Sequence, residues 1–170
     1  MRHHDQVSSA DESFQQFASR LDYPMFVVTT AVADERAGCL VGFSTQASID
    51  PVRYLVALSN KNRTYRLALR ADHLAVHAFA REHADRARLF GGRTGDDIDK
   101  FSESPWRPGP AGMPILDDAA GWFVGRILKR IPFGDHDGFL LAPMAAEVAE
   151  AAGGLVSFSD VRTISPGHEA

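Results

Sequence analysis

Residues 38–51, with the sequence GCLVGFSTQASIDP, lie between two stretches rich in strand-forming residues, 23–30 and 54–58. Small and hydroxyl residues gather in this segment, namely Gly38, Gly42, Ser44, Thr45 and Ser48. Glycine lets a backbone approach a ligand closely, and hydroxyl groups both donate and accept hydrogen bonds. The residues alone leave two interpretations open: a ligand-binding segment, or a turn and strand that need small side chains for packing.

The chain has 170 residues and a formal net charge of -4, which suits one domain with short tails. We place the domain at 11–163, a flexible tail at 1–10 and a second tail at 164–170. A single cysteine excludes an intrachain disulfide and suits a cytoplasmic location. No cluster of Lys and Arg points to nucleic acid, and no apolar run of about 18 residues points to a membrane helix.

Runs of β-branched and apolar residues bounded by polar turns predict strands at 25–33, 39–48, 53–59, 73–80, 121–131, 135–142 and 155–158. Helical spacing of apolar residues predicts short helices at 11–21, 64–71 and 82–90. Short links between strands favour antiparallel pairing, and the GxGxxG motif of a Rossmann fold is missing. The expected fold class is therefore mainly β with a few helices, a barrel of antiparallel strands with the helices on its outside.

Five fragments of the chain stand in a characteristic order. They are 38–51, Asn62–Tyr65, Asp99–Phe101 followed by Trp106, Gly112–Leu116 and Gly134–His136. In this order and spacing the chain resembles the flavin reductase-like family, the FMN-binding split barrels, which include the reductase partners of two-component monooxygenases. The resemblance extends over 23–162, and Gly-Asp-His after a barrel strand is its most characteristic piece.

The resemblance implies a split β-barrel that forms a homodimer, with a flavin near the subunit interface. The stretch that matches the flavin-lining segment supplies Cys39, Leu40, Val41, Gly42, Phe43, Ser44 and Ser48. The loop that matches the phosphate-binding segment supplies Ser59, Asn60, Asn62, Arg63 and Thr64. His136 matches the histidine near the flavin face on which the nicotinamide stacks, so we expect it to position a ligand or handle a proton.

Three positions depart from the pattern of the family. Leu40 and Gly42 stand where its members often carry hydroxyl groups that bond the flavin, and Gln46 replaces a usual serine. Backbone donors survive such replacements, so FMN is the first expectation, with FAD or a deazaflavin as alternatives. The sequence does not choose between NADH and NADPH as hydride donor, because it has no ribose-reading acid on a Rossmann frame.

The resemblance implies an enzyme, an NAD(P)H:flavin oxidoreductase that passes hydride to FMN or to free flavin and supplies reduced flavin to a monooxygenase. Two other classes stay open: a non-catalytic carrier or sensor that binds flavin, deazaflavin or haem, and a dimeric structural protein whose ligand site has decayed. Simpler roles also exist for single residues, since His136 fits a hydrogen-bonded strand end and Arg63 fits a solvated surface charge. The histidines lack metal-ligand spacing, so we expect no metal site.

Overall fold

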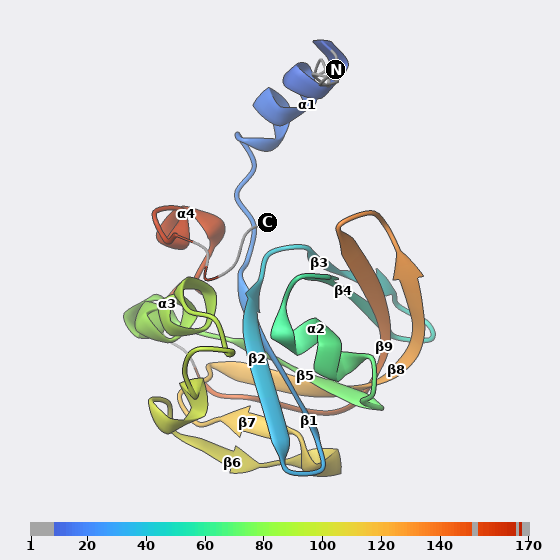
Figure 1. Cartoon of the computed structure of the whole chain (residues 1–170), viewed down its shortest axis with the longest axis vertical. Coiled ribbons are helices and arrows are strands. Elements are labelled where there is room, and N and C mark those ends of the chain that lie inside the picture. Colours follow the sequence, from blue (N-terminus) through green and yellow to red (C-terminus); the bar gives the residue numbers. More distant parts are fainter. Residues whose placement is uncertain (1–8, 151–152, 166, 168–170) are drawn as a thin grey trace.

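The computed structural model describes residues 9–150, 153–165 and 167. Seven strands form one antiparallel sheet in the order β2-β1-β5-β8-β9-β4-β3 (Figure 1). They are β1 (Phe26–Val32), β2 (Glu35–Val41), β3 (Ser44–Ser48), β4 (Arg53–Ser59), β5 (His73–Ala78), β8 (Gly121–Pro132) and β9 (His136–Val148). A separate two-stranded sheet pairs β6 (Trp106–Pro108) with β7 (Pro114–Leu116).

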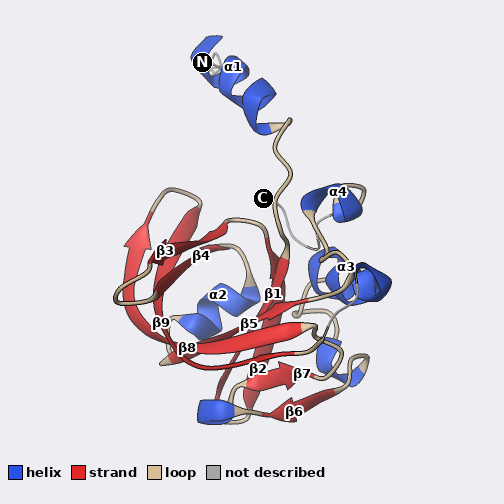
Figure 2. Ribbon diagram, turned by 180° about the vertical axis from the view of Figure 1, so that it is seen from behind, coloured by secondary structure: helices blue, strands red, loops and turns tan. Residues whose placement is uncertain are grey.

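Four α-helices accompany the sheet: α1 (Ser9–Ala18), α2 (Arg63–Ala68), α3 (Ala84–Gly92) and α4 (Phe158–Val161). Three short 3-10 turns complete the set: Arg81–His83, Lys100–Ser102 and Pro110–Gly112. Figure 2 shows α2 within the curve of the sheet, α3 and α4 beside it, and α1 projecting away from the body. Every helix in the described part of the chain is too short or too polar to span a bilayer.

The two edge strands of the seven-stranded sheet, β2 and β3, are consecutive in the chain. Only Gly42 and Phe43 separate them, and the Phe43 carbonyl accepts a hydrogen bond of 2.8 Å from the Ala57 amide. The prediction of one strand over 39–48 was therefore wrong, because the chain turns a corner at these two residues. The sheet curls but its edges do not pair with each other, which confirms the split-barrel fold class.

Helix α2 fills the inside of the curled sheet, where the sequence analysis had placed helices on the outside. Ala68 and Tyr65 pack into an apolar cluster with Val56 and Phe139 from the inner face of the sheet. The Tyr65 hydroxyl donates a hydrogen bond of 2.9 Å to Asp137 at the start of β9. The helix therefore belongs to the core, and that one prediction was wrong.

Strand β1 is buried on both faces, as the alternation of its side chains dictates. Val28 faces the inner cluster, whereas Val27 faces a second cluster that contains Phe79 from the end of β5 and Phe90 from α3. Ile164 also packs against this second cluster, although the sequence placed it in a tail. The central strands thus support one core inside the barrel and another beneath α3.

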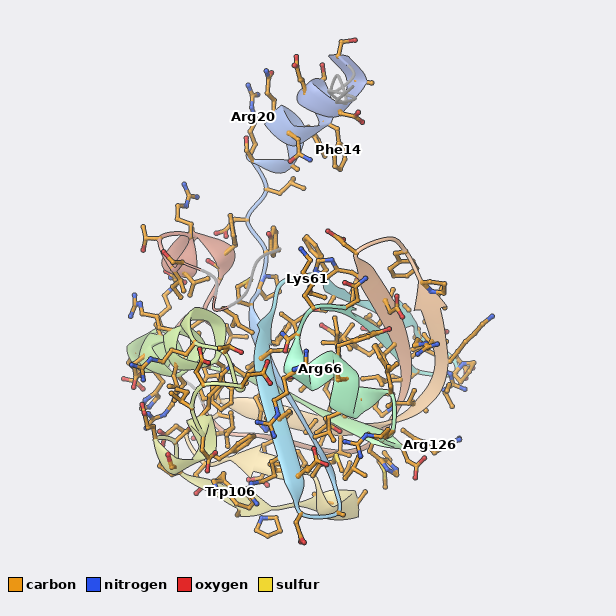
Figure 3. All side chains as sticks on the ribbon, viewed as in Figure 1. Phe14, Arg20, Lys61, Arg66, Trp106 and Arg126 are labelled. Atoms are coloured by element: carbon orange, nitrogen blue, oxygen red, sulfur yellow. The ribbon has the colours of Figure 1, made fainter. Side chains whose placement is uncertain are left out.

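The ends of the chain differ from the sequence-based expectation. Helix α1 (Ser9–Ala18) forms, but none of its residues is buried, and Phe14 is 61% and Phe17 60% exposed. Figure 3 shows Phe14 on this helix, away from the body of the protein. The predicted strand at 155–158 consists of isolated bridges, between Ala80 and Leu155 and between Pro24 and Ser157. Amphipathic spacing predicted the helix correctly but does not reveal what its apolar face contacts.

A buried histidine ties three strands together. The His77 Nδ1–H on β5 donates to the Val27 carbonyl of β1 over 2.9 Å, and Nε2 accepts from the Leu116 amide of β7 over 3.2 Å. These partners fix the neutral tautomer, since a carbonyl only accepts and an amide N–H only donates. Burial lowers the pKa of His77 to about 4.

We predict that this histidine makes folding sensitive to mild acid. The unfolded chain protonates His77 below about pH 6.5, whereas the folded chain resists protonation down to about pH 4, so stability is full above pH 6.5 and is lost as pH falls through this window. The free energy of unfolding should fall by about 2 kcal/mol between pH 7 and pH 5. Urea unfolding of His77→Asn should show a much smaller fall, while the exposed-site variant His83→Asn should behave like wild type. Equal slopes in all three proteins would contradict the assignment.

Candidate functional site

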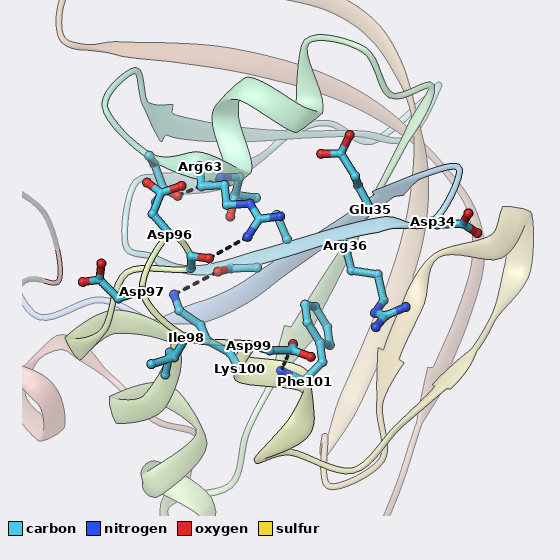
Figure 4. A pocket seen from close by; sticks show the side chains of 15 residues that line it. Asp34, Glu35, Arg36, Arg63, Asp96, Asp97, Ile98, Asp99, Lys100 and Phe101 are labelled. Carbon is cyan, nitrogen blue, oxygen red and sulfur yellow. Dashed lines mark hydrogen bonds between the residues drawn. The ribbon is translucent and has the colours of Figure 1, made fainter.

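Two hollows lie at the loops that join the strands. The first, which we call the α2 hollow, has a volume of about 410 Å³ and lies between β2, the start of α2 and the loop 95–101 (Figure 4). The second, which we call the β9 hollow, has a volume of about 370 Å³. Its lining consists of Phe43, Ser44, Thr45, Leu55, Ala57, Phe133, Asp135 and His136.

The first residues of α2 line the α2 hollow, and they are three of the predicted phosphate ligands. Asn62 caps the helix, because its Oδ1 accepts a hydrogen bond of 2.9 Å from the Thr64 amide. Arg63 extends toward the loop 95–101 and donates from Nη1 to the Gly95 carbonyl over 2.6 Å (Figure 4). Asn62, Arg63 and Thr64 all line this hollow, and their role as phosphate ligands stays a prediction.

Lys100 fastens the loop 95–101 to the body of the protein. Its side chain is buried, and Nζ donates to the Gly38 carbonyl over 3.1 Å and to the Phe90 carbonyl over 2.8 Å. Burial lowers the pKa of this lysine. Because both carbonyls stabilise the ammonium group, Lys100 holds β2, α3 and the floor of the α2 hollow in one arrangement.

A small pit of about 10 Å³ adjoins the α2 hollow and shares Arg63 and Lys100 with it. Its lining is Lys61, Asn62, Arg63, Phe90, Arg93, Thr94, Gly95 and Lys100. None of these described residues carries a carboxylate, although Arg93 has Glu103 within 3.5 Å on its outer side. The Lys100 ammonium group is engaged by backbone carbonyls, so the positive charge that borders the pit comes from Lys61, Arg63 and Arg93. With the polar side chains of Asn62 and Thr94 beside them, these charges favour an anion at its mouth.

His136 stands at the edge of the β9 hollow. It begins β9 opposite Ser59 of β4, and its Nδ1–H donates to Asp135 Oδ1 over 2.7 Å. The hydrogen bond from His136, and the electrostatic attraction of its imidazole, lower the pKa of Asp135. The Phe43 ring lies against the imidazole, with centroids 5.1 Å apart. With Nδ1 engaged by Asp135, Nε2 is the nitrogen left for a ligand.

The loop before α2 holds the Gly-Asp-His turn in place through hydrogen bonds. The Asn60 amide donates to the Asp135 carbonyl over 2.9 Å, and the Asn60 side chain reaches the Gly134 carbonyl over 3.5 Å. Ser59 pairs with His136 through the backbone of the sheet. Ser59 and Asn60, predicted to hold a phosphate, do not line the cationic pit themselves. They lie next to it, because the Asn62 amide donates to the Ser59 carbonyl over 3.0 Å.

The predicted flavin-lining stretch divides between the core and the β9 hollow. Cys39 and Val41 point into the barrel, and Leu40 points outward against α3, where a Cβ on Gly91 would come within 2.6 Å of it. A Cβ on Gly42 would come within 2.7 Å of the Tyr23 ring, so this glycine has a packing reason of its own. Residues 39–42 therefore line neither hollow.

Two other members of that stretch do reach the β9 hollow. Phe43 and Ser44 line it, and the Ser44 hydroxyl lies 3.1 Å from the hydroxyl of Tyr54. Ser48 lies at the far end of β3, beyond a bulge in the pairing of this strand with β4. Of the seven predicted flavin-lining residues, the structure therefore groups only Phe43 and Ser44 with His136, and Thr45 joins them in the lining of the hollow.

Several residues of the site were missed by the sequence analysis. Leu55 and Ala57 form the floor of the β9 hollow, and Phe133 borders it from the turn before Gly134. The uninterrupted apolar run of β4 was the available indication, because it gives the strand two apolar faces rather than one. For Phe133 the available indication was its place in a short turn, where a large aromatic side chain is not needed to build the core.

The curled, open antiparallel sheet places this protein in the split-barrel class. Its aromatic hollow and the cationic pit suit a ligand that carries both a flat ring and a phosphate group. Residues 18–165 match the family model described as "Flavin reductase like domain". The chain therefore belongs to the flavin reductase-like family, which confirms the resemblance seen in its sequence.

Named relatives and a solved structure agree with this family. FMN reductase (NADH) RutF of Methylorubrum extorquens is 31% identical over 144 residues, which cover 85% of this chain and 70% of that protein. The reductase component of 4-hydroxyphenylacetate 3-monooxygenase from Pseudomonas aeruginosa is 28% identical over 156 residues, 91% of each chain. The FMN-binding protein from Thermus thermophilus with bound 1-cyclohex-2-enone is 25% identical, with a TM-score of 0.76 over 88% of this chain and 82% of that one.

Proposed function

We propose that this protein is a flavin reductase that transfers hydride from NADH or NADPH to FMN, with FAD as an alternative acceptor. The observation that carries the proposal is the β9 hollow, in which His136 of the Gly-Asp-His turn stands beside an aromatic wall and an apolar floor. The names of the relatives, FMN reductase (NADH) and a monooxygenase reductase component, support the same activity.

The residues of the site fit a flavin nucleotide. An apolar floor of Leu55 and Ala57 with a phenylalanine at its border suits a flat heterocycle, and Ser44 and Thr45 add hydroxyl groups at its edge. The cationic pit beside Arg63 suits a phosphate. The absence of the family hydroxyls at Leu40 and Gly42 is weak evidence against flavin binding, since both positions serve packing in this chain.

The flavin supplies the hydride chemistry when bound, and the protein supplies binding, orientation and electrostatics. Asp135 holds Nδ1 of His136, which leaves Nε2 to donate to or accept from a ligand in the β9 hollow. His136 is 23% exposed in its side chain, so it is reachable without being fully solvated. We assign to it the placement of the nicotinamide or the handling of a proton, with no covalent step.

A partner and an assembly follow from the same proposal. A relative that is named as a monooxygenase reductase component supports delivery of reduced flavin to such an oxygenase. The homodimer and the cytoplasmic location remain expectations from the sequence. The alternative of a flavin carrier without turnover keeps some support, because the Thermus thermophilus neighbour is named only as an FMN-binding protein.

The role of His136 predicts a loss of rate rather than of binding. His136→Ala should slow flavin reduction by NADH at least tenfold, because a positioned hydrogen-bonding group is removed from the reacting rings. The dissociation constant of FMN should stay within about twofold of wild type. Anaerobic stopped-flow absorbance measures the rate, and fluorescence titration measures the binding. His83→Ala, on the 3-10 turn before α3, serves as the control; an unchanged rate in His136→Ala would refute the role.

The role of the cationic pit predicts a phosphate-dependent loss of affinity. Arg63→Ala should weaken FMN binding about tenfold, as expected for one charge-assisted hydrogen bond, while leaving riboflavin binding unchanged. Arg70→Ala removes the same charge from a surface ion pair with Glu35 and should change neither affinity. Equal losses for FMN and riboflavin would show that Arg63 shapes the site instead of binding the phosphate.

A further inference from the structure

Phe133 is an exposed aromatic residue in the turn between β8 and β9. Its side chain borders the β9 hollow, and the residue is 56% exposed. The turn is fixed on both sides, because the Phe133 amide donates to the His136 carbonyl over 3.0 Å and Asn60 contacts the next two residues. The ring is therefore displayed on a braced hairpin rather than on a free loop.

The position of this ring depends on a glycine in the neighbouring strand. A Cβ added to Gly138 of β9 would lie 2.5 Å from the Phe133 Cε2 and 2.6 Å from its Cζ. These distances are well inside van der Waals contact, so the edge of the ring rests directly on the backbone of Gly138. Any larger residue at 138 would push the ring away from this place.

A second exposed ring borders the same hollow. Phe43 is 59% exposed and contacts the imidazole of His136, while Leu55 and Ala57 of β4 line the same hollow as an apolar floor. Two exposed phenylalanines around one apolar floor, with Ser44, Thr45, Asp135 and His136 at the edges, form a concave surface that is typical of a ligand site. Within a flavin reductase, the ligands that offer flat faces to such rings are the flavin and the nicotinamide.

We propose that Phe133 stacks on a planar heteroaromatic ring bound in the β9 hollow, and that Gly138 keeps Phe133 in the place where it can do so. This inference rests on the proposed function and adds a binding residue to it. The ring is either the isoalloxazine of the flavin or the nicotinamide of the hydride donor. The two share the chemistry of a flat π-face, and titration separates them.

The test uses two variants that disturb the same contact in different ways. Phe133→Ala removes the ring, and Gly138→Ala displaces it while the ring remains in the chain. Each should raise the dissociation constant or the KM of the stacked ligand about 3- to 10-fold, as expected for the loss of one aromatic stack. Phe133→Tyr should retain wild-type binding, and Phe17→Ala, which removes a similarly exposed ring from α1, should have no effect.

The measured constants decide between the two ligands. A raised dissociation constant for FMN in both variants assigns the stack to the flavin. A raised KM for NADH with unchanged FMN binding assigns it to the nicotinamide. Unchanged constants in both variants would overturn the inference, and an effect of Phe133→Ala without one of Gly138→Ala would overturn the role of the glycine. A wild-type protein that binds FMN, but whose bound FMN is reduced by neither NADH nor NADPH, would contradict the proposed function alone, since the FMN titration still tests Phe133.

Discussion

The two-residue corner at Gly42 and Phe43 constrains the whole sheet. A flat sheet of seven strands would hold its edge strands about 29 Å apart, from six spacings of about 4.8 Å. The chain from the end of β2 at Val41 to the start of β3 at Ser44 spans three residue steps, at most about 11 Å. The sheet must therefore curl until its two edges nearly meet, and α2 fills the inside of that curl.

The candidate site follows from the same corner. Because Phe43 lies at the turn, its side chain faces the start of β9 and contacts His136, whereas its carbonyl is fixed by Ala57. The helix that fills the barrel begins at Arg63 and is capped by Asn62, so the polar start of α2 lies beside the loop held by Lys100. A split barrel thus places an aromatic hollow and a cationic pit on loops that a rigid sheet supports.

Much of this could be predicted from the sequence. The β-branched runs located the strands, and the ordered fragments around Asn62 and the Gly-Asp-His turn identified the family. The corner at Gly42 was missed because both sides of it read as one strand. The division of the 39–44 stretch was also missed. Alternation along β2 sends Cys39 and Val41 into the core and Leu40 against α3, and the corner places Phe43 and Ser44 at the β9 hollow, so a motif read as one unit lies in three places.

Other features depend on contacts that no local pattern contains. Helical spacing predicted α1 but not that Phe14 would stay exposed, and turn chemistry explained Gly134 but not why Phe133 precedes it. The contact between the Phe133 ring and the backbone of Gly138 forms only when the β8–β9 hairpin folds, so the sequence does not reveal it. Long-range packing, rather than propensity, decides which side chains surround a ligand.

The central claim, that this barrel reduces flavin, is tested most directly by the visible absorption spectrum of the protein with FMN under anaerobic conditions. Addition of NADH or NADPH should bleach the oxidised flavin band at a rate that rises with protein concentration and far exceeds the rate without protein. A spectrum that shows bound FMN but does not change with either dinucleotide would contradict the claim and favour a flavin carrier.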